Sequence, residues 1–176
     1  MKNLKDILYK IPIEEVLGST NIVINSVQFD SRKIELNDVF VAQKGITVDG
    51  HLFIEKAISL GATVIICEEF PEVISNNCTY IKVKDSNSAL AIITSNYFEN
   101  PSSKLRLIGV TGTNGKTTIA SLLYQLFQKA GFKVGLLSTV KVIVDTKEFN
   151  ATHTTPDSLT INSYLNDMVH EGVEYC

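Results

Sequence analysis

The chain alternates between two hydrophobic spacings. Short runs rich in β-branched and aromatic residues, typical of buried strands, alternate with stretches in which apolar residues recur every three or four positions, typical of amphipathic helices. Before residue 99, strands are predicted at 22–24, 26–29, 38–42, 62–67 and 80–83, and helices at 3–10, 51–60 and 87–98. Gly61 is placed to end the second helix and Ser86 to begin the third. This pattern predicts a small N-terminal α/β domain.

The pattern is interrupted by a polar segment at 99–104, Glu-Asn-Pro-Ser-Ser-Lys. Such a segment is typical of an interdomain linker, so we predict one domain at 1–100 and a second that begins at 101. In the second, strands are predicted at 105–108, 133–137 and 173–176, helices at 119–127 and 157–170, and a hairpin over 140–151 with its tip at 145–148. Strands that alternate with helices favour a parallel sheet, in which 105–108 would be buried. The fold class is therefore α/β.

The segment between the strand 105–108 and the next helix carries the clearest chemical signal. It reads Gly-Val-Thr-Gly-Thr-Asn-Gly-Lys-Thr-Thr over 109–118, which is the layout of a phosphate-binding loop. Glycines let backbone N–H groups surround a polyphosphate, and the helix N-terminus adds partial positive charge. Lys116 is predicted as the catalytic residue that reaches the β- and γ-phosphates, and Thr117 as the Mg²⁺ ligand. ATP contacts are predicted for Gly112, Thr113, Asn114, Gly115, Lys116, Thr117 and Thr118.

Two features of the sequence bear on whether this loop belongs to a standard nucleotide site. Val110 stands where the first glycine of the standard pattern is expected, so a glycine-rich connection without a ligand is the alternative. The run 142–145 imitates a strand that ends in a magnesium-binding aspartate. We reject that interpretation, because Asp145 lies at the expected tip of a hairpin.

Composition and charge narrow the function further. The chain has 176 residues and a formal net charge of −3, with no block of Lys or Arg, so no nucleic-acid partner is expected. No signal-peptide core and no apolar run of membrane-spanning length is present, so no membrane insertion is expected. Three unclustered cysteines suit a reducing cytoplasm better than a disulfide framework.

Four blocks of sequence together resemble the Mur ligases, the ATP-dependent amide-forming enzymes of peptidoglycan precursor synthesis. The blocks are Asp30-Ser31-Arg32 with the strand 38–42, the glycine-containing segment 45–62 with Asp49-Gly50-His51, the phosphate-binding loop 109–118, and Thr154-Thr155-Pro156. They occur in the order of the family and span nearly the whole chain. The loop alone also suits folylpolyglutamate synthetases, but the Asp-Ser-Arg domain does not.

The resemblance implies a reaction and a set of contacts. ATP would phosphorylate the D-Glu side-chain carboxylate of UDP-MurNAc-L-Ala-D-Glu, and the amine of meso-diaminopimelate or L-lysine would attack the acyl phosphate. ATP and Mg²⁺ are the implied cofactors. The residues implied to contact UDP-MurNAc-peptide are Phe29, Ser31, Ile46, Thr47, Val48, His153, Thr154 and Thr155. The first domain would hold the uridine nucleotide, and 101–176 would begin the ATP-binding domain. The resemblance further implies that the chain is a fragment, inactive by itself, of a monomeric three-domain enzyme.

Several of these residues also have structural explanations. Asp30 can form an Asx-turn after its strand, and the pair Thr154-Thr155 suits a helix-entry turn before proline. We interpret Asp49-Gly50-His51 as structural: Asp49 would cap the next helix, Gly50 would supply an unusual φ, and His51 would bond at its first turn. His153 stands where the family most often has Asn, and no second His or carboxylate at suitable spacing makes it a metal ligand.

Two other functions fit parts of the sequence. A small P-loop kinase or GTPase would need a true magnesium-binding aspartate and a base-recognition motif, and neither is evident. A non-catalytic, truncated module that binds a UDP-sugar would need only the first domain.

Overall fold

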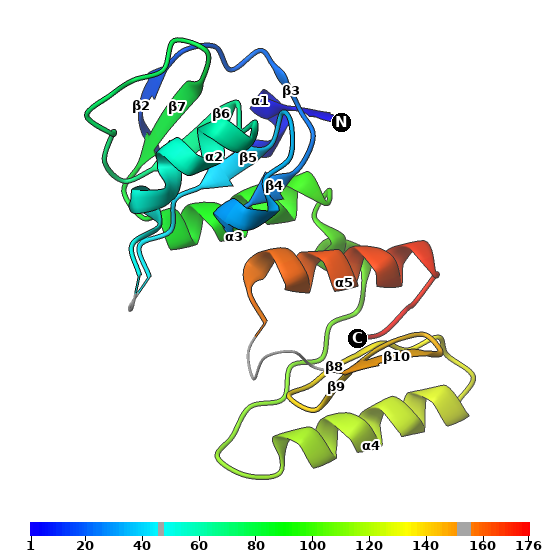
Figure 1. Cartoon of the computed structure of the whole chain (residues 1–176). Coiled ribbons are helices and arrows are strands. Elements are labelled where there is room, and N and C mark those ends of the chain that lie inside the picture. The colour runs from blue at the N-terminus through cyan, green and yellow to red at the C-terminus, as the bar shows by residue number, and fades with distance from the viewer. Residues whose placement is uncertain (46–47, 151–155) are drawn as a thin grey trace. The chain divides into compact units, whose positions relative to one another are not determined.

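The computed structural model describes residues 1–45, 48–150 and 156–176. The chain forms two compact units, Met1–Tyr97 and Phe98–Cys176, and Figure 1 shows the elements of each. Among the helices that the structure describes, none has the length and apolar character needed to cross a membrane.

The described residues of the first unit form a five-stranded sheet in the order β2-β7-β6-β5-β4. Strands β4, β5, β6 and β7 are parallel, and β2 joins the β7 edge in the antiparallel direction. In register, Phe40 of β5 pairs with Ile65 of β6, which pairs with Tyr80 of β7. The strands are β2 (Ile13–Leu17), β4 (Val27–Gln28), β5 (Val39–Val41), β6 (Val64–Cys67) and β7 (Thr79–Val83). A separate pair joins β1 (Lys2–Asn3) to β3 (Val23–Ile24).

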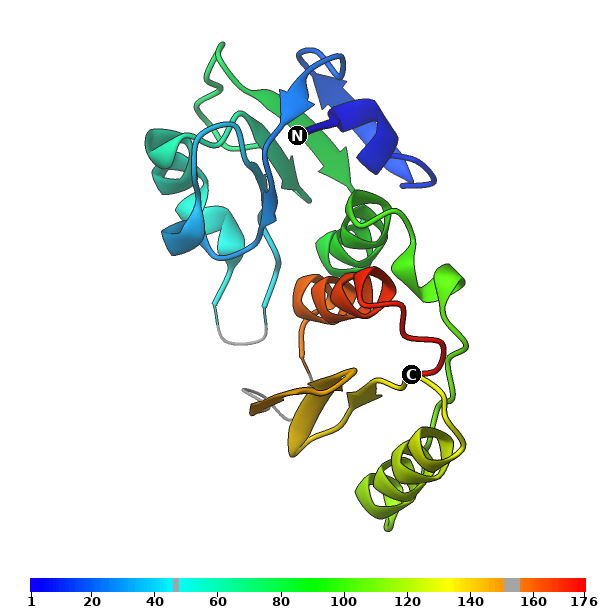
Figure 2. The ribbon, with the colours of Figure 1, turned by 90° about the vertical axis from the view of Figure 1, so that its right-hand side faces the viewer.

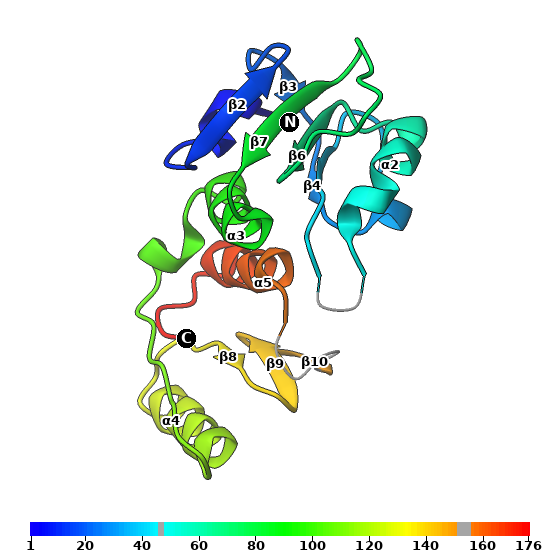
Figure 3. The same cartoon turned by 90° about the vertical axis from the view of Figure 1, so that its left-hand side faces the viewer.

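Both faces of this sheet are covered, as in other parallel sheets. One face packs on α1 (Leu4–Ile7) and α3 (Ser86–Tyr97). The other face packs on α2 (Ile54–Leu60), which follows the 3₁₀ helix η2 (Gly50–Phe53). Figure 3 shows α2 and α3 on opposite sides of the strands. The inner strands β5 and β6 are buried on both faces and continuously apolar, which explains why hydrophobic runs predicted them well.

The first unit differs from the sequence-based prediction in several places, among them β2, α1 and α3. Strand β2 was not predicted, because this exposed edge strand carries Glu14 and Glu15 and has no clear apolar alternation. Helix α1 is a single turn rather than an eight-residue helix. Helix α3 begins one residue before the prediction, and its cap is Asp85, whose carboxylate accepts the N–H groups of Asn87 and Ser88. Gly61 ends α2 at φ 116°, as predicted.

The second unit contains α4 (Lys116–Lys129), α5 (Ser158–His170) and a short 3₁₀ helix, η3 (Pro101–Lys104). Strands β8 (Leu136–Leu137), β9 (Lys141–Val144) and β10 (Lys147–Asn150) form an antiparallel sheet. Bridges join Tyr175 in parallel to both Arg106 and Val134, so the segment 173–176 lies between 105–108 and 133–137. Figure 2 shows α4 and α5 on opposite sides of these extended segments.

The predicted hairpin is present, and its turn is tighter than expected. Lys147 and Glu148 belong to β10, so Asp145 and Thr146 alone make the turn, with Asp145 at φ 54°. Asp145 therefore lies at a hairpin tip and not at the end of a parallel strand. This confirms the predicted hairpin position, on which we rejected the magnesium-binding motif.

The prediction that 105–108 is a buried strand was wrong in part. Three backbone hydrogen bonds pair it in parallel with the segment 174–176, but Leu107 is 50% exposed and Ile108 is 43% exposed. The reason is that α4, which comes after the loop, contributes no buried residue. Within the described residues, Leu105 is buried, but Leu107 and Ile108 line an incompletely filled space.

Candidate functional site

The phosphate-binding loop connects 105–108 to the first turn of α4. Gly112 has φ 144° and Gly115 has φ 78°, a region that residues with a Cβ rarely adopt. Gly115 immediately precedes Lys116, the first residue of α4, and no side chain caps this helix start. The first N–H groups of a helix have no partner within the helix. The glycines thus shape a turn that leaves backbone donors at the end of α4 available to an anion.

Lys116 lies at this helix start with its ammonium turned back over the loop. Its Nζ donates to the carbonyl oxygens of Gly112 and Thr113, the second at 3.3 Å. The ammonium therefore already lies where oxygen acceptors gather along the loop. Phosphate oxygens could replace these neutral carbonyls as stronger, charge-assisted acceptors.

Thr117 is half-buried, and its hydroxyl lies 3.4 Å from that of Thr139. A hydroxyl oxygen is a hard ligand of the kind that Mg²⁺ accepts, but Mg²⁺ usually takes one or two carboxylates together with phosphate oxygens and water. In the part of the chain that the structure describes, no three His, Cys, Asp or Glu side chains are grouped to hold a metal ion. Thr117 fits Mg²⁺ as one ligand among those that a nucleotide and water would supply.

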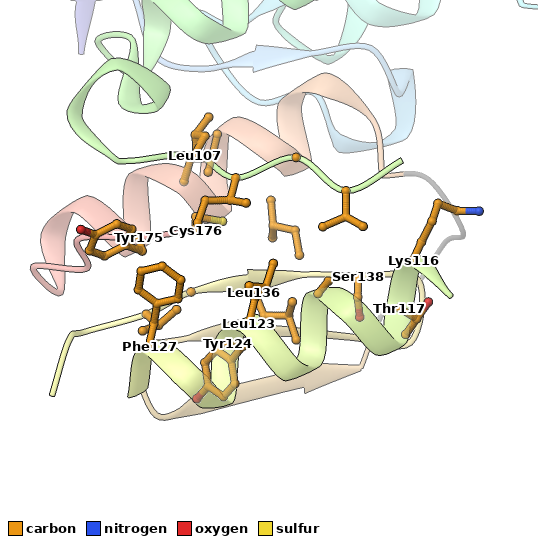
Figure 4. Close-up of a pocket in the computed structure, with 18 of the residues that line it drawn as sticks. Leu107, Lys116, Thr117, Leu123, Tyr124, Phe127, Leu136, Ser138, Tyr175 and Cys176 are labelled. Atoms are coloured by element: carbon orange, nitrogen blue, oxygen red, sulfur yellow. The ribbon is translucent and has the colours of Figure 1, made fainter. Parts of the chain in front are cut away.

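A cavity of about 410 Å³ lies beside the loop, within the second unit. Its walls are mostly apolar and come from α4, β8, the segment 107–110 and α5. In Figure 4, Lys116 and Thr117 lie at one end of this cavity, whereas Phe127 and Tyr175 lie at the other. The charged ammonium of Lys116 and the hydroxyl of Thr117 therefore lie at the loop end of the cavity, and the rest of the cavity along α4 is mostly apolar.

In the first unit, the Asp30-Ser31-Arg32 motif forms the 3₁₀ helix η1 (Ser31–Lys33) directly after β4. Asp30 accepts the backbone N–H of Arg32 at 3.0 Å and both guanidinium bonds of its side chain, at 2.9 and 2.8 Å. These bonds, the side-chain pair above all, lower the pKa of Asp30 from 3.8 to about 2. The Asx-turn that we gave as the structural alternative is thus present.

Ser31 differs from its two neighbours. It is 6% exposed, and its hydroxyl forms no hydrogen bond to the described residues. Phe29, two residues earlier, packs against the core. Asp30 is paired with Arg32, whereas the Ser31 hydroxyl is unused by the described residues and could bond to a ligand. Arg32 is 78% exposed and also keeps N–H donors that Asp30 does not use.

Asp49, Gly50 and His51 form a structural junction. Asp49 Oδ1 accepts the N–H of His51 at 2.9 Å and contacts His51 Nδ1 at 2.6 Å, while His51 Nε2 accepts the N–H of Glu68 at 2.9 Å. The prediction of an unusual φ for Gly50 was wrong. Gly50 is required because a Cβ there would lie 2.6 Å from the carbonyl oxygen of Gln43.

Of the predicted ATP contacts, 112–115 form the loop and 116–118 form the first turn of α4. Phe29 and Ser31 lie at one turn after β4. Val48 is 55% exposed, and its carbonyl accepts the N–H of Gly45. The other predicted contacts lie outside the described residues, namely Ile46, Thr47, His153, Thr154 and Thr155. Thr139 was not predicted as a site residue; in the sequence it lies between the predicted strand 133–137 and the predicted hairpin 140–151.

Comparison with protein families identifies the class. Residues 23–98 match the model of the Mur ligase family catalytic domain, and residues 110–176 match that of the Mur ligase middle domain. The chain therefore belongs to the Mur ligase family.

Individual proteins of the family are similar to almost the whole of this chain. A UDP-N-acetylmuramoyl-L-alanyl-D-glutamate–2,6-diaminopimelate ligase of Cytophaga hutchinsonii is 51% identical over 174 residues, and the protein of the same name from Clostridium tetani is 46% identical over 175. Each match covers 98% of this chain but 36% of the relative, so the chain spans about a third of the length of these relatives.

Solved structures agree with this family. A ligase structure of the same name has a TM-score of 0.77 and 24% identity, and covers 99% of this chain and 34% of its own. At this identity the likeness shows the fold. MurF ligase from Thermotoga maritima, in complex with ADP, has a TM-score of 0.55 and 31% identity over 81% of this chain and 29% of its own.

Proposed function

We propose that this chain contributes two substrate sites of an ATP-dependent amide ligase of peptidoglycan precursor synthesis. Residues 1–100 would bind UDP-MurNAc-L-Ala-D-Glu, and 101–176 would begin the ATP-binding domain. The observation that supports the proposal is the loop before α4, where the Lys116 ammonium lies over the loop next to the first turn of the helix, an arrangement that suits an anion. The relatives are named as 2,6-diaminopimelate ligases, which supports diaminopimelate rather than L-lysine as the amino acid joined.

The loop suits the first step of such a reaction. A carboxylate oxygen of D-Glu attacks the γ-phosphorus of ATP, the bond to the bridging oxygen breaks, and ADP leaves. Negative charge spreads over the transferring phosphoryl group, where Lys116 and the N–H groups of α4 stabilise it. When bound, Mg²⁺ would neutralise further phosphate charge, with Thr117 as its protein ligand. The amine then attacks the acyl carbon and inorganic phosphate departs.

For the sugar nucleotide, we propose a site in the first unit, around Phe29, Ser31 and Val48. The open hydroxyl of Ser31 supports this. Ser31→Ala should weaken binding of UDP-MurNAc-L-Ala-D-Glu several-fold by calorimetry, because one hydrogen bond contributes about 0.5–1.5 kcal/mol. The matched control is Ser59→Ala, since Ser59 is exposed and its hydroxyl bonds only within α2. Unchanged affinity in Ser31→Ala would move the site elsewhere.

Nucleotide preference separates this proposal from a P-loop GTPase. The chain should bind ATP with Mg²⁺ more tightly than GTP with Mg²⁺, whereas a GTPase would prefer GTP. The hairpin position of Asp145 already disfavours the GTPase, because that residue cannot serve at the end of a parallel strand. We place the reaction in the cytoplasm, in agreement with free thiols at Cys67, Cys78 and Cys176.

A further inference from the structure

Parallel pairing in the second unit brings the phosphate-binding loop and the pair Ser138-Thr139 to the same edge of the sheet. The segments 105–108 and 133–137 both run parallel to 173–176, through the bridges of Arg106 and Val134 to Tyr175. The chain therefore leaves both segments at the same edge, beyond the carboxyl ends of the strands, where open α/β sheets bind ligands. The phosphate-binding loop comes directly after the first segment, and Ser138 and Thr139 come directly after β8 in the second.

Ser138 and Thr139 use their hydroxyls differently. The hydroxyl of Ser138 accepts the N–H of Lys141 at 3.1 Å and donates to the Lys141 carbonyl at 2.8 Å, which closes the turn into β9. Thr139 stands at the corner of this turn, exposed to solvent, and the one partner of its hydroxyl within the described residues is Thr117, 3.4 Å away. The turn thus fixes Thr139 opposite the residue proposed to meet the metal ion.

A threonine hydroxyl has one proton and two lone pairs. If the Thr117 oxygen ligates Mg²⁺, one lone pair points at the metal, and the proton must point away from it to an acceptor. The Thr139 oxygen lies within reach for that role. Partners of this kind, which hold a metal ligand in its binding orientation, usually change metal affinity by about 10–100-fold when removed.

We propose that Thr139 is a positioning residue for the Mg²⁺-nucleotide, because its hydroxyl accepts the Thr117 proton and so turns the Thr117 oxygen toward the metal. This inference rests on the proposed function. It makes the polar end of β8 part of the nucleotide site, although the glycine-rich motif does not include it.

The test measures ATP affinity with Mg²⁺ and again with EDTA, by calorimetry on the full 176-residue chain. Thr139→Val keeps the shape of the side chain but removes the acceptor, and it should weaken binding about tenfold with Mg²⁺ and leave it unchanged with EDTA. Thr139→Ser keeps the hydroxyl and should bind like the natural chain. Thr146→Val is the matched control, since Thr146 is exposed at the tip of the β9–β10 hairpin.

A double-mutant comparison shows whether Thr139 acts through Thr117. In a Thr117→Val background, Thr139→Val should cause no further loss of Mg²⁺-dependent affinity, and additive losses would overturn the inference. An equal loss with Mg²⁺ and with EDTA in Thr139→Val would also overturn it, because that pattern indicates a general structural effect. If the natural chain binds no ATP under either condition, the proposed function fails instead.

Discussion

The hydrogen bonds of His51 make a sharp prediction about the stability of the first unit. A backbone N–H can only donate, so the contact with Glu68 makes His51 Nε2 an acceptor and places the ring proton on Nδ1, facing Asp49. The side chain of His51 is 17% exposed and that of Asp49 is 41% exposed. This ring therefore joins the start of η2 to the carboxyl end of β6.

His51→Ala removes both bonds of the ring. The Asp49 carboxylate is partly exposed and can bond to water instead, so the loss of its bond to the ring costs little. The Glu68 N–H is part-buried, and a buried donor left without a partner costs about 1–3 kcal/mol. We expect the free energy of unfolding of the first unit to fall by about this amount.

The measurement combines urea unfolding with amide hydrogen exchange, which assigns the change to one unit of the chain. In His51→Ala, exchange at the Glu68 amide should accelerate more than at the amides of β6, which ends at the preceding residue. The control is His170→Ala, since His170 is exposed at the last turn of α5. A loss below about 0.5 kcal/mol, the size of an ordinary surface substitution, would show that the Glu68 N–H does not depend on His51 for its stabilisation.

Single contacts give three further predictions. The pKa of Asp30 is lowered to about 2, so the Asp30 carboxylate contributes stability that is present above pH 3.8 and is lost as the pH falls toward 2. In Arg32→Ala, the titration midpoint of Asp30 measured by NMR should rise toward 3.8. An unchanged midpoint would contradict the ion pair of Asp30 with Arg32. Gly50→Ala should lower the melting temperature, since its Cβ would meet the Gln43 carbonyl oxygen at 2.6 Å, and an unchanged value would show that the approach is not restrictive. Limited proteolysis should cut first near 98–104 and leave a stable N-terminal piece, whereas a first cut within β6 would contradict the division into two units.

Local signals predicted much of the fold. Gly61 could be placed at the end of α2 because a left-handed residue there favours glycine, and Asp157 caps α5 as its sequence suggests. Strand β2 could not be predicted, because an exposed edge strand is held by its pairing with β7 and not by its own hydrophobicity. The exposure of Leu107 also depends on tertiary packing, which a run of apolar residues does not report.

The candidate site, like the fold, could be predicted only in part. The glycines, Lys116 and Thr117 are adjacent in sequence, so their shared loop could be predicted from a motif. Thr139 is 22 residues from Thr117, and only the parallel pairing around Tyr175 brings it to the same sheet edge. The structural role of Gly50 likewise depends on a contact with Gln43, which the local sequence does not reveal.

If the proposed function is right, the loop before α4 binds the phosphates of ATP through Lys116. The most direct measurement is calorimetric titration of the chain with ATP and Mg²⁺, in the natural sequence and in Lys116→Ala, with Lys129→Ala at the far end of α4 as the matched control. We expect weak but measurable binding in the natural chain, the same binding in Lys129→Ala, and none in Lys116→Ala. ATP binding that survives in Lys116→Ala would show that this loop is not the nucleotide site.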